Sequence, residues 1–387
     1  MLLCLTASLL AADPPKSAAA WTPKDKEMVV LLGSAFIEQE ARDGYLETEL
    51  IRLFPNKDIR VRNLGWSGDT VHCQARSYFG PPEEGFERLR GHLQVIKPTT
   101  VICCYGANES WKGEPGIPDF RKAYERLIDM IRQTGATVVL MTPPRFDPRE
   151  ANSAPLEKAA EYLRRYFQEI KYIAEGRRCL FHDFGGQFPS PSTTVMANGV
   201  AYSTWGYSQA PAYFWGFMDE SLRSLDPYVQ ASFKRDLKKY HGTKISGISK
   251  SDTTLRWTQL DDVLPTAASP PGVCFQREDH IVRCNVDGKP VRLLPPTQTV
   301  GLIEGPEVKQ TDQLRQAIIK KNALFFHRWR PANETYLYGF RKHEQGNNGV
   351  EPPQFDKLVE QAEAEIARLK KPAPHRYELV RVEEKKN

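Results

Sequence analysis

Hydrophobic and polar residues follow a repeated order between residue 27 and about residue 185. A short run of apolar residues, typical of a buried strand, is followed each time by a longer segment whose apolar residues recur every three or four positions, as in a helix. Apolar strands that alternate with helices predict a parallel sheet covered on both faces, a doubly wound three-layer α/β fold of the flavodoxin-like kind. The predicted strands are EMVVLLG (27–33), IRVRNLGW (59–66), TTVICCYG (99–106), TVVLMTPP (137–144) and RCLFHDFGG (178–186).

The pattern changes after the fifth unit. Residues 216–250 are charged and predict a helical segment that leads away from the sheet. The next stretch is rich in Thr, Val and Pro, and its Asp287-Gly288 pair is a hairpin signal, so a small β-rich insertion is expected at 246–312. Helical periodicity returns in 313–375, which we expect to pack on the α/β domain formed by 25–245.

The first twelve residues, MLLCLTASLLAA (1–12), form a short apolar stretch that ends in small residues and precedes a polar segment. This is typical of a secretory signal with cleavage near Ala12, and it predicts a bacterial protein that is secreted or held in the periplasm or cell envelope. The alternative is a simple apolar N-terminus, because no Lys or Arg precedes the run. No later stretch reaches the roughly 18 apolar residues of a transmembrane helix.

Composition narrows the possible partners. The 387 residues carry 53 basic and 48 acidic side chains, a net charge of +5 without any long basic block, which argues against a nucleic-acid partner. We therefore expect a small-molecule or glycan ester ligand. There is no C-x-x-C pair, and we expect neither a metal nor a cofactor. Cys274 and Cys284 flank a polar segment and would close a hairpin if they formed a disulfide, which the sequence leaves open.

In doubly wound sheets, ligands bind beyond the carboxyl ends of the strands. The segments at these positions are Gly33-Ser34-Ala35, NLGWSGD (63–69), GANES (106–110) and, after the fifth strand, MANGVAYSTWGY (196–207). Together they resemble the sequence blocks of the SGNH hydrolases, the GDSL-type esterases and lipases, over residues 25 to 215. In that family a G-D-S block carries the nucleophilic serine, a later glycine and asparagine donate to the oxyanion, and a D-x-x-H block completes the triad.

The resemblance is uneven at the catalytic positions. It implies that Gly65 and Asn108 are oxyanion-hole donors and that Gly33 and Ser34 belong to the same binding edge. The nucleophile position, however, is Ala35, and the histidine position is Ala201. Depending on the spacing, Asn198 or Ala197 takes the position of the acid. Removing such a triad costs on the order of 10⁶ in turnover, while the oxyanion donors and binding retain about 10³ to 10⁴ over water.

The sequence therefore predicts an SGNH-fold protein that binds a glycan or acyl ester and hydrolyses it little or not at all. One alternative is an active esterase that uses other residues, such as Ser34 or the segment around His343 and Glu344. Another is an interaction module of the cell envelope. In the second block, Asp69 could be a general base or cap the following turn, and we favour the cap.

The segment HRWRPANETYLYGFRKHEQGNN (327–348) is dense in polar and aromatic side chains. It is similar to a tail found in a secreted bacterial subgroup of the family with degenerate catalytic blocks. Aromatic rings beside planar Arg groups suit the recognition of sugars or carboxylates, so we expect a lid over the cleft. A network of Arg–carboxylate pairs that pins the tail to the α/β domain is the favoured alternative. The residues expected in the cleft or lid are Asp69, Glu109, His327, Arg330, Asn333, Arg341, His343 and Glu344.

Overall fold

The computed structural model describes residues 21–78, 80–151, 154–188, 194–218, 226–232, 236–266, 273–276, 280–296, 300–344 and 348–382. The apolar stretch at 1–12 lies outside these residues. Within the described part of the chain, no helix is long and apolar enough to cross a membrane.

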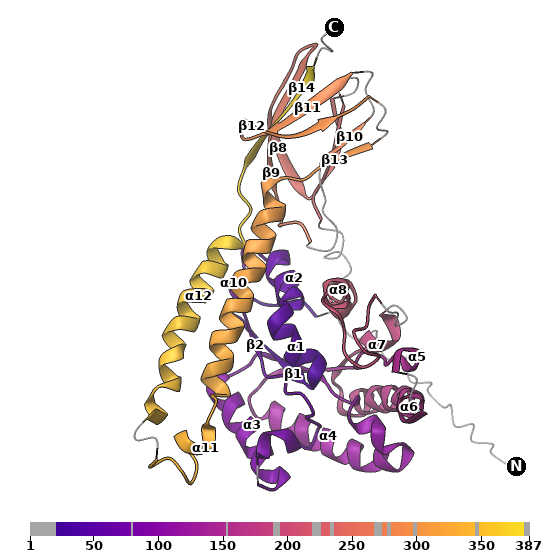
Figure 1. Ribbon diagram of the computed structural model, residues 1–387, viewed down its shortest axis with the longest axis vertical. Helices are drawn as coiled ribbons and strands as arrows, with labels where there is room; N and C mark the ends of the chain where they lie inside the picture. Colours follow the sequence, from indigo (N-terminus) through magenta and orange to yellow (C-terminus); the bar gives the residue numbers. More distant parts are fainter. Residues whose placement is uncertain are drawn as a thin grey trace, which may run out of the picture.

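A five-stranded parallel sheet forms the centre of the larger part of the molecule (Figure 1). Its order is β2-β1-β3-β4-β5, so the chain adds β2 on one side of β1 and then β3, β4 and β5 on the other side. This places a topological switch point between β1 and β3. The predicted doubly wound α/β fold is confirmed, with strands β1 (Glu27–Gly33), β2 (Ile59–Asn63), β3 (Thr100–Cys104), β4 (Thr137–Met141) and β5 (Leu180–His182).

Helices cover both faces of this sheet because successive strand residues point to opposite sides. In β1, Val29 and Leu31 belong to one buried cluster, whereas Val30 and Leu32 belong to another. The first cluster is completed by α1 (Ala35–Asp43), α2 (Tyr45–Leu53), α7 (Phe184–Gln187), α8 (Thr204–Gln209) and α9 (Pro211–Phe214). The second is completed by α3 (Pro82–Ile96), α4 (Ile117–Arg132) and α6 (Ala154–Arg177).

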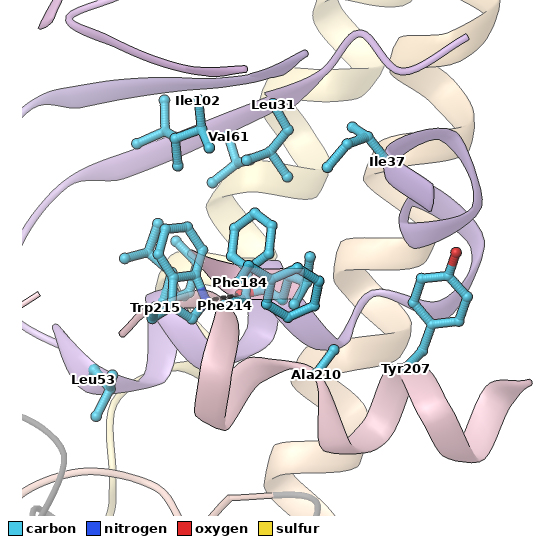
Figure 2. Close-up of a cluster of buried hydrophobic side chains, with 14 of the residues drawn as sticks. Leu31, Ile37, Leu53, Val61, Ile102, Phe184, Tyr207, Ala210, Phe214 and Trp215 are labelled. Atoms are coloured by element: carbon cyan, nitrogen blue, oxygen red, sulfur yellow. Dashed lines mark hydrogen bonds between the residues drawn. The ribbon is translucent and has the colours of Figure 1, made fainter. Parts of the chain in front are cut away.

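The first cluster is rich in aromatic rings, as Figure 2 shows. Leu31, Val61 and Ile102 extend from three neighbouring strands toward Phe214 and Trp215, and all five side chains are buried. Phe184 from α7 lies in the same layer. This packing holds the segment after the fifth strand against α1, where the resemblance expects the last catalytic block.

A mixed four-stranded sheet, in which β10 and β6 are parallel, and an antiparallel five-stranded sheet form a separate β-rich part at one end of the molecule (Figure 1). One has the order β13-β10-β6-β7 and the other β12-β11-β14-β9-β8. The expected insertion is present, but it begins earlier than 246, and the helical segment predicted for 216–250 is wrong. The strands are β6 (Tyr228–Ser232), β7 (Asp236–His241), β8 (Thr243–Lys250), β9 (Thr254–Asp261), β10 (Val273–Gln276), β11 (Ile281–Val286), β12 (Lys289–Leu294), β13 (Val300–Ile303) and β14 (His375–Val382).

The disulfide between Cys274 and Cys284, which the sequence left open, is not formed in this structure. Cys284 is a buried free thiol, and burial raises its pKa to about 12. β10 and β11, which carry the two cysteines, belong to different sheets and are not paired with each other.

Two long helices form the C-terminal return. α10 (Pro306–Trp329) runs from the β-rich part along the α/β domain, and α12 (Phe355–Leu369) lies beside it (Figure 1). Both lie on the side of the sheet where β2 is the edge strand, and Arg62 of β2 forms an ion pair with Glu363 of α12. Between them lie α11 (Glu334–Leu337) and the residues of the polar tail.

Candidate functional site

Three loops meet at the carboxyl end of the parallel sheet, as the topology predicts. Gly33 at the end of β1 is in register with Cys104 at the end of β3. The Trp66 N–H, after β2, donates to the Gly33 carbonyl at 3.0 Å. Asn108, after β3, donates through Nδ2 to the Asp69 carbonyl at 2.7 Å. The first three resembling blocks therefore form one continuous edge.

The tip of the first loop carries no exposed hydroxyl. Ala35 is the first residue of α1 and is exposed, so a methyl group occupies the position where the resemblance expects the nucleophile. Ser34 precedes it as the N-cap residue, and its side chain is buried and makes no capping hydrogen bond. A Cβ on Gly33 would lie 2.6 Å from the Cys104 carbonyl oxygen, so the loop has no room for a larger residue there. This burial weakens Ser34 as a replacement nucleophile.

Gly65 is not available as an oxyanion donor. Its N–H donates to Asn63 Oδ1 at 2.8 Å, and Asn63 Nδ2 donates in turn to the Ile37 carbonyl at 2.6 Å. A Cβ on Gly65 would lie 2.2 Å from the backbone nitrogen of Glu38, which gives this glycine a packing role instead.

Gly68 is the glycine of this loop that can donate. It is exposed, has φ of +80°, and its N–H has no hydrogen-bond partner within the described residues. The sequence signal for it was the Ser-Gly-Asp turn, because a left-handed position favours glycine. Gly65 was predicted in its place, because no sequence pattern shows that the Asn63 side chain occupies the Gly65 N–H.

Asn108 retains one donor. Its amide nitrogen carries two hydrogens, and the bond to the Asp69 carbonyl uses one of them. The side chain is half-buried at the start of a 3-10 helix (Glu109–Lys112). Asn108 and Gly68 therefore lie on adjoining loops. Within the described residues, the Gly68 N–H has no hydrogen-bond partner, and one of the two Asn108 Nδ2 hydrogens has none.

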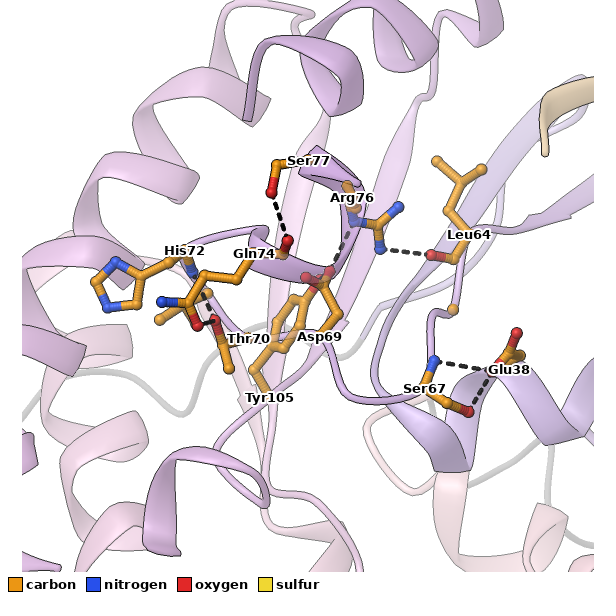
Figure 3. A network of polar contacts seen from close by, with 12 residues as sticks. Glu38, Leu64, Ser67, Asp69, Thr70, His72, Gln74, Arg76, Ser77 and Tyr105 are labelled. Carbon is orange, nitrogen blue, oxygen red and sulfur yellow. Dashed lines mark hydrogen bonds and ion pairs between the residues drawn. The ribbon is translucent and has the colours of Figure 1, made fainter. Parts of the chain in front are cut away.

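Asp69 is neither a base nor a cap. Its carboxylate is fully buried, accepts from Arg76 Nε at 2.6 Å and from the Tyr105 hydroxyl at 3.1 Å, and Arg76 also donates to the Leu64 carbonyl at 2.7 Å (Figure 3). A buried carboxylate that is held by a guanidinium and a phenol hydroxyl cannot reach a ligand at the edge. Asp69 therefore fixes the second loop from behind.

Glu109 is also buried. Its carboxylate accepts the N–H of Val71 at 2.8 Å and that of Gly106 at 2.9 Å, and so bridges the second and third loops. Burial raises its pKa to about 7, against the effect of these two hydrogen bonds. The structure thus gives Glu109 a positioning role next to Asn108, instead of the contact in the cleft that the sequence predicted.

The fifth block forms a tight turn beside the first loop. Asn198 Oδ1 accepts the N–H groups of Val200 and Ala201, and the Ala197 N–H donates to the Ala201 carbonyl. All three positions of the expected acid and base, at 197, 198 and 201, are exposed. The Tyr207 hydroxyl donates to the Phe36 carbonyl at 3.1 Å, which joins this block to the start of α1. None of these side chains can take a proton from a nucleophile.

A polar group that the sequence analysis missed lies beside Gly68. Glu38 of α1 accepts the Ser67 N–H at 2.8 Å and the Ser67 hydroxyl with the same carboxylate oxygen, Oε2 (Figure 3). Its other oxygen, Oε1, accepts from Arg330 Nη1 at 2.7 Å. Arg330 also stacks on the Trp66 ring, with its central carbon 3.6 Å from the ring centroid. Of the predicted lid residues, Arg330 is the one that contacts this loop.

The other predicted lid residues lie elsewhere. His327 is exposed and packs against Phe355, and Asn333 opens α11 in the left-handed conformation. Arg341 and Glu344 form a local ion pair at 3.6 Å. His343 is exposed and makes no hydrogen bond to another described residue.

The tail is nevertheless tied to the α/β domain. Glu334 accepts from the Tyr78 hydroxyl and forms an ion pair with Arg88 of α3. The contacts of Arg330 and Glu334 agree with the predicted network of Arg–carboxylate pairs. Among the described residues, no group of three His, Cys, Asp or Glu side chains could hold a metal ion.

The chain is similar to proteins of known family and fold. Residues 33–202 match the sequence model of the GDSL-like Lipase/Acylhydrolase family. No curated protein is similar enough to count as a match. Among solved structures, a gut microbial diltiazem-metabolizing enzyme shares the fold over 94% of this chain and 99% of its own, with a TM-score of 0.70 and 13% sequence identity.

Two further solved structures match about half of the chain. An acetylxylan esterase from Geobacillus stearothermophilus, solved as a catalytic mutant, covers 50% of this chain and 94% of its own, with 19% identity and a TM-score of 0.40. A lipase/acylhydrolase from Enterococcus faecalis covers 49% and 94%, with 20% identity and a TM-score of 0.38. Over residues 33–202, the chain is therefore similar to the GDSL-like lipases and acylhydrolases, the SGNH hydrolases.

Proposed function

We propose that this protein binds an acyl compound, an ester or amide of a glycan, at the carboxyl end of its parallel sheet and hydrolyses it little or not at all. The observation that carries the proposal is Ala35, an exposed methyl group at the first position of α1, where a serine esterase needs a hydroxyl. Ala201 and Asn198 add nothing that could act as a base. Gly68 and Asn108 still offer N–H donors to a carbonyl oxygen. The apolar stretch at 1–12 supports an exported location for this binding protein.

The test combines a turnover assay with a binding assay on the full chain. We expect no saturable hydrolysis of p-nitrophenyl acetate or of acetylated sugars. N-acetylglucosamine, whose acetamide carbonyl can accept the same donors, should bind and raise the melting temperature. Asn108→Ala should weaken this binding about tenfold, since it removes a donor to the carbonyl. Asn56→Ala, an exposed asparagine outside the site, is the matched control.

Two results would reject the binding proposal. Saturable hydrolysis would favour an enzyme, and the absence of any shift in melting temperature with acylated sugars would favour the third possibility, an interaction module of the cell envelope. Equal binding by Asn108→Ala and by the unaltered protein would move the ligand away from this edge.

A specific contact supports a second candidate, an unconventional hydrolase. The exposed Ser67 hydroxyl donates to the Glu38 carboxylate, and the next residue, Gly68, offers an N–H. Ser67 Oγ would attack the carbonyl carbon while Glu38 takes its proton. The alcohol would leave with that proton, and water would then release the acyl group from Ser67. The whole fold is compatible with catalysis, because the structure that shares it over nearly the full chain is that of a metabolizing enzyme.

The hydrolase candidate predicts that Ser67→Ala and Glu38→Gln each abolish turnover and that a fluorophosphonate labels Ser67. Ser34→Ala, His343→Ala and Glu344→Ala serve as comparisons, because the sequence pointed to these residues. Loss of turnover in one of those three variants alone would reject the Ser67 mechanism. The Glu38 carboxylate already accepts hydrogen bonds from Arg330 and from the Ser67 N–H, so we favour the binding protein.

A further inference from the structure

Arg330 brings a guanidinium from outside the family-matched segment to the candidate site. It follows the last residue of α10, and its Nη1 donates to Glu38 Oε1 at 2.7 Å. The other Glu38 oxygen holds the Ser67 N–H, and Ser67 precedes Gly68. The Glu38 carboxylate therefore connects Arg330 to Ser67, the residue that precedes the Gly68 donor.

The Arg330 side chain is held in a fixed orientation. Its central carbon lies 3.6 Å from the centroid of the Trp66 ring and 5.5 Å from that of Phe326. Trp66 is itself buried and packs edge-on against Trp329, with ring centroids 5.7 Å apart. A planar cation stacked on a buried ring loses little further entropy when it forms a hydrogen bond. Arg330 is thus preorganised, with 25% of its side chain exposed.

One edge of this guanidinium is unused. Arginine has five N–H donors, and the edge formed by Nε and Nη2 presents two of them side by side, the geometry that binds both oxygens of a carboxylate. Glu38 contacts Nη1 alone. Within the described residues, Nε and Nη2 have no hydrogen-bond or ion-pair partner. Arg330 therefore holds a carboxylate fork open beside the acyl-binding loop.

The acidic groups around this fork already have partners. Asp69 is paired with Arg76, whose guanidinium lies 5.5 Å from the Trp66 centroid on the buried side. Glu334 is paired with Arg88. Glu38 accepts three hydrogen bonds, two from Ser67 and one from Arg330. Each of these carboxylates already has a charged partner, so the fork is available to a ligand.

We propose that the Nε–Nη2 edge of Arg330 binds a carboxylate of the ligand, so that the ligand is an acidic acyl compound such as the N-acyl or O-acyl derivative of an acidic sugar. This inference rests on the proposed acyl-binding function and names the substrate class of the same site. Recognition depends on two directed hydrogen bonds more than on overall charge, because the neighbouring cations are each paired with an anion. A neutral acyl sugar would use only the donors at Gly68 and Asn108.

The experiment compares two probes with the full-length protein. N-acetylglucosamine and N-acetylmuramic acid share the ring and the acetamide, and only the second carries a lactyl carboxylate. Titration calorimetry at pH 7 should give N-acetylmuramic acid about tenfold tighter binding. Arg330→Gln should bring the ratio of the two dissociation constants close to one. Arg330→Lys, which keeps the charge without the fork, should give a ratio between these values.

Arg328→Gln is the matched control. Arg328 lies two residues away, forms an ion pair with Asp356 at 2.9 Å and has 26% of its side chain exposed, almost the same as Arg330. It should keep the tenfold preference. Because Arg330 also braces Trp66, the ratio of dissociation constants is the deciding quantity, since a loosened loop would weaken both probes together.

The possible failures are distinguishable. Equal binding of the two probes by the unaltered protein, or a preference that persists in Arg330→Gln, would overturn the assignment of the fork. If neither amino sugar binds, the proposed acyl-binding function fails first, and this inference fails with it. If the preference for N-acetylmuramic acid is lost in Arg328→Gln as well as in Arg330→Gln, the preference comes from the overall positive charge of the tail. That result would also overturn the proposal.

Discussion

In our proposal, Ala35 and Ala201 stand at the two positions where the resemblance to the family expects a nucleophile and its base. A serine hydroxyl attacks only with a base in hydrogen-bond reach, and a base works only when it is oriented. The turn around Asn198 orients nothing but backbone N–H groups. In this proposal, a binding protein differs from an esterase by a few side-chain atoms, while the carboxyl end of the parallel sheet keeps its N–H donors.

Restoring these atoms should restore turnover in steps. Ala35→Ser alone should leave p-nitrophenyl acetate hydrolysis at background, because no base faces the new hydroxyl. Ala35→Ser combined with Ala201→His should raise hydrolysis at least tenfold over either single variant, as expected when two parts of one catalytic unit act together. Initial rates at pH 8 test this. Full activity from Ala35→Ser alone would show that another base is already present.

Glu109 makes a separate prediction about pH. Burial raises its pKa from the ordinary 4.5 to about 7. Between these values the folded protein keeps a proton that the unfolded chain has lost, so this group's contribution makes stability fall as pH rises from about 4.5 to about 7. The loss is on the order of 3 kcal/mol. Urea unfolding at several pH values gives the free energy of unfolding as a function of pH. This free energy should fall less steeply with pH in Glu109→Gln than in the unaltered protein. Glu157→Gln, which replaces an exposed residue, should keep the original pH dependence.

At the candidate site, the sequence predicts which loops meet but not which side chains contact each other. The edge formed by Gly33, Asn108 and the second loop was predictable, because the ends of parallel strands meet. Gly65 was chosen in place of Gly68 because the choice depends on whether Asn63 folds back onto its own loop. Arg330 and Glu38 are 292 positions apart in the sequence, and a local sequence pattern cannot predict a contact between such distant residues.

At the scale of elements, α10 is fastened to the α/β domain by one buried cation. Lys321 is 1% exposed, and its ammonium donates to Glu47 Oε2 of α2, to the Val61 carbonyl of β2 and to Asn322 Oδ1. Burial lowers the pKa of Lys321 and raises that of Glu47, so each charge depends on the other. Replacing Lys321 leaves the buried Glu47 carboxylate without its cation, and replacing Glu47 leaves the buried Lys321 ammonium without its anion.

Lys321→Met should therefore destabilise the protein by about 3 to 5 kcal/mol, because it leaves Glu47 buried without a counter-charge. The double variant Lys321→Met with Glu47→Leu should recover most of this loss, since two apolar side chains of similar size need no pairing. A double-mutant cycle measured by chemical denaturation gives the coupling. A double variant as unstable as Lys321→Met would mean that the Val61 and Asn322 contacts dominate.

The elements differ in how well the sequence predicts them. The five parallel strands and the helices α2, α3, α4, α6, α10 and α12 were predicted, because each is a continuous run with its own period. The stretches Tyr228–Ser232, Asp236–His241 and Thr243–Lys250 were predicted as part of a charged helical segment, yet they form the strands β6, β7 and β8. Their strand conformation depends on partners such as β9, β10 and one another, and tertiary pairing overrode local preference.

At the scale of the whole molecule, the β-rich part is assembled from two distant stretches of chain. Residues 228–303 supply all its strands but one, and β14 comes from the C-terminus and pairs with both β9 and β11. Tyr377 and Leu379 of β14 are buried in the core of this part, and the Tyr377 ring stacks on Trp257 with centroids 5.3 Å apart.

Truncation after Pro372 should therefore unfold the β-rich part and leave the parallel sheet intact. Removing β14 takes the middle strand from the order β12-β11-β14-β9-β8, so two strand pairings and two buried side chains are lost together. Limited trypsin digestion should cut the truncated chain within 228–303 and spare the α/β domain. Truncation after Val382, which keeps all of β14, is the control. Resistance of both chains would contradict the role given to β14.

The position of β14 also governs the order in which the protein can mature during synthesis. All five parallel strands have been made by residue 182, so the α/β sheet can form while translation continues. β9 and β11, by contrast, wait for a strand that is made only after α10 and α12. Until then their backbones present unpaired edges, the kind of surface on which nascent chains associate wrongly. Synthesis of β14 is thus the step that protects this part of the protein against aggregation.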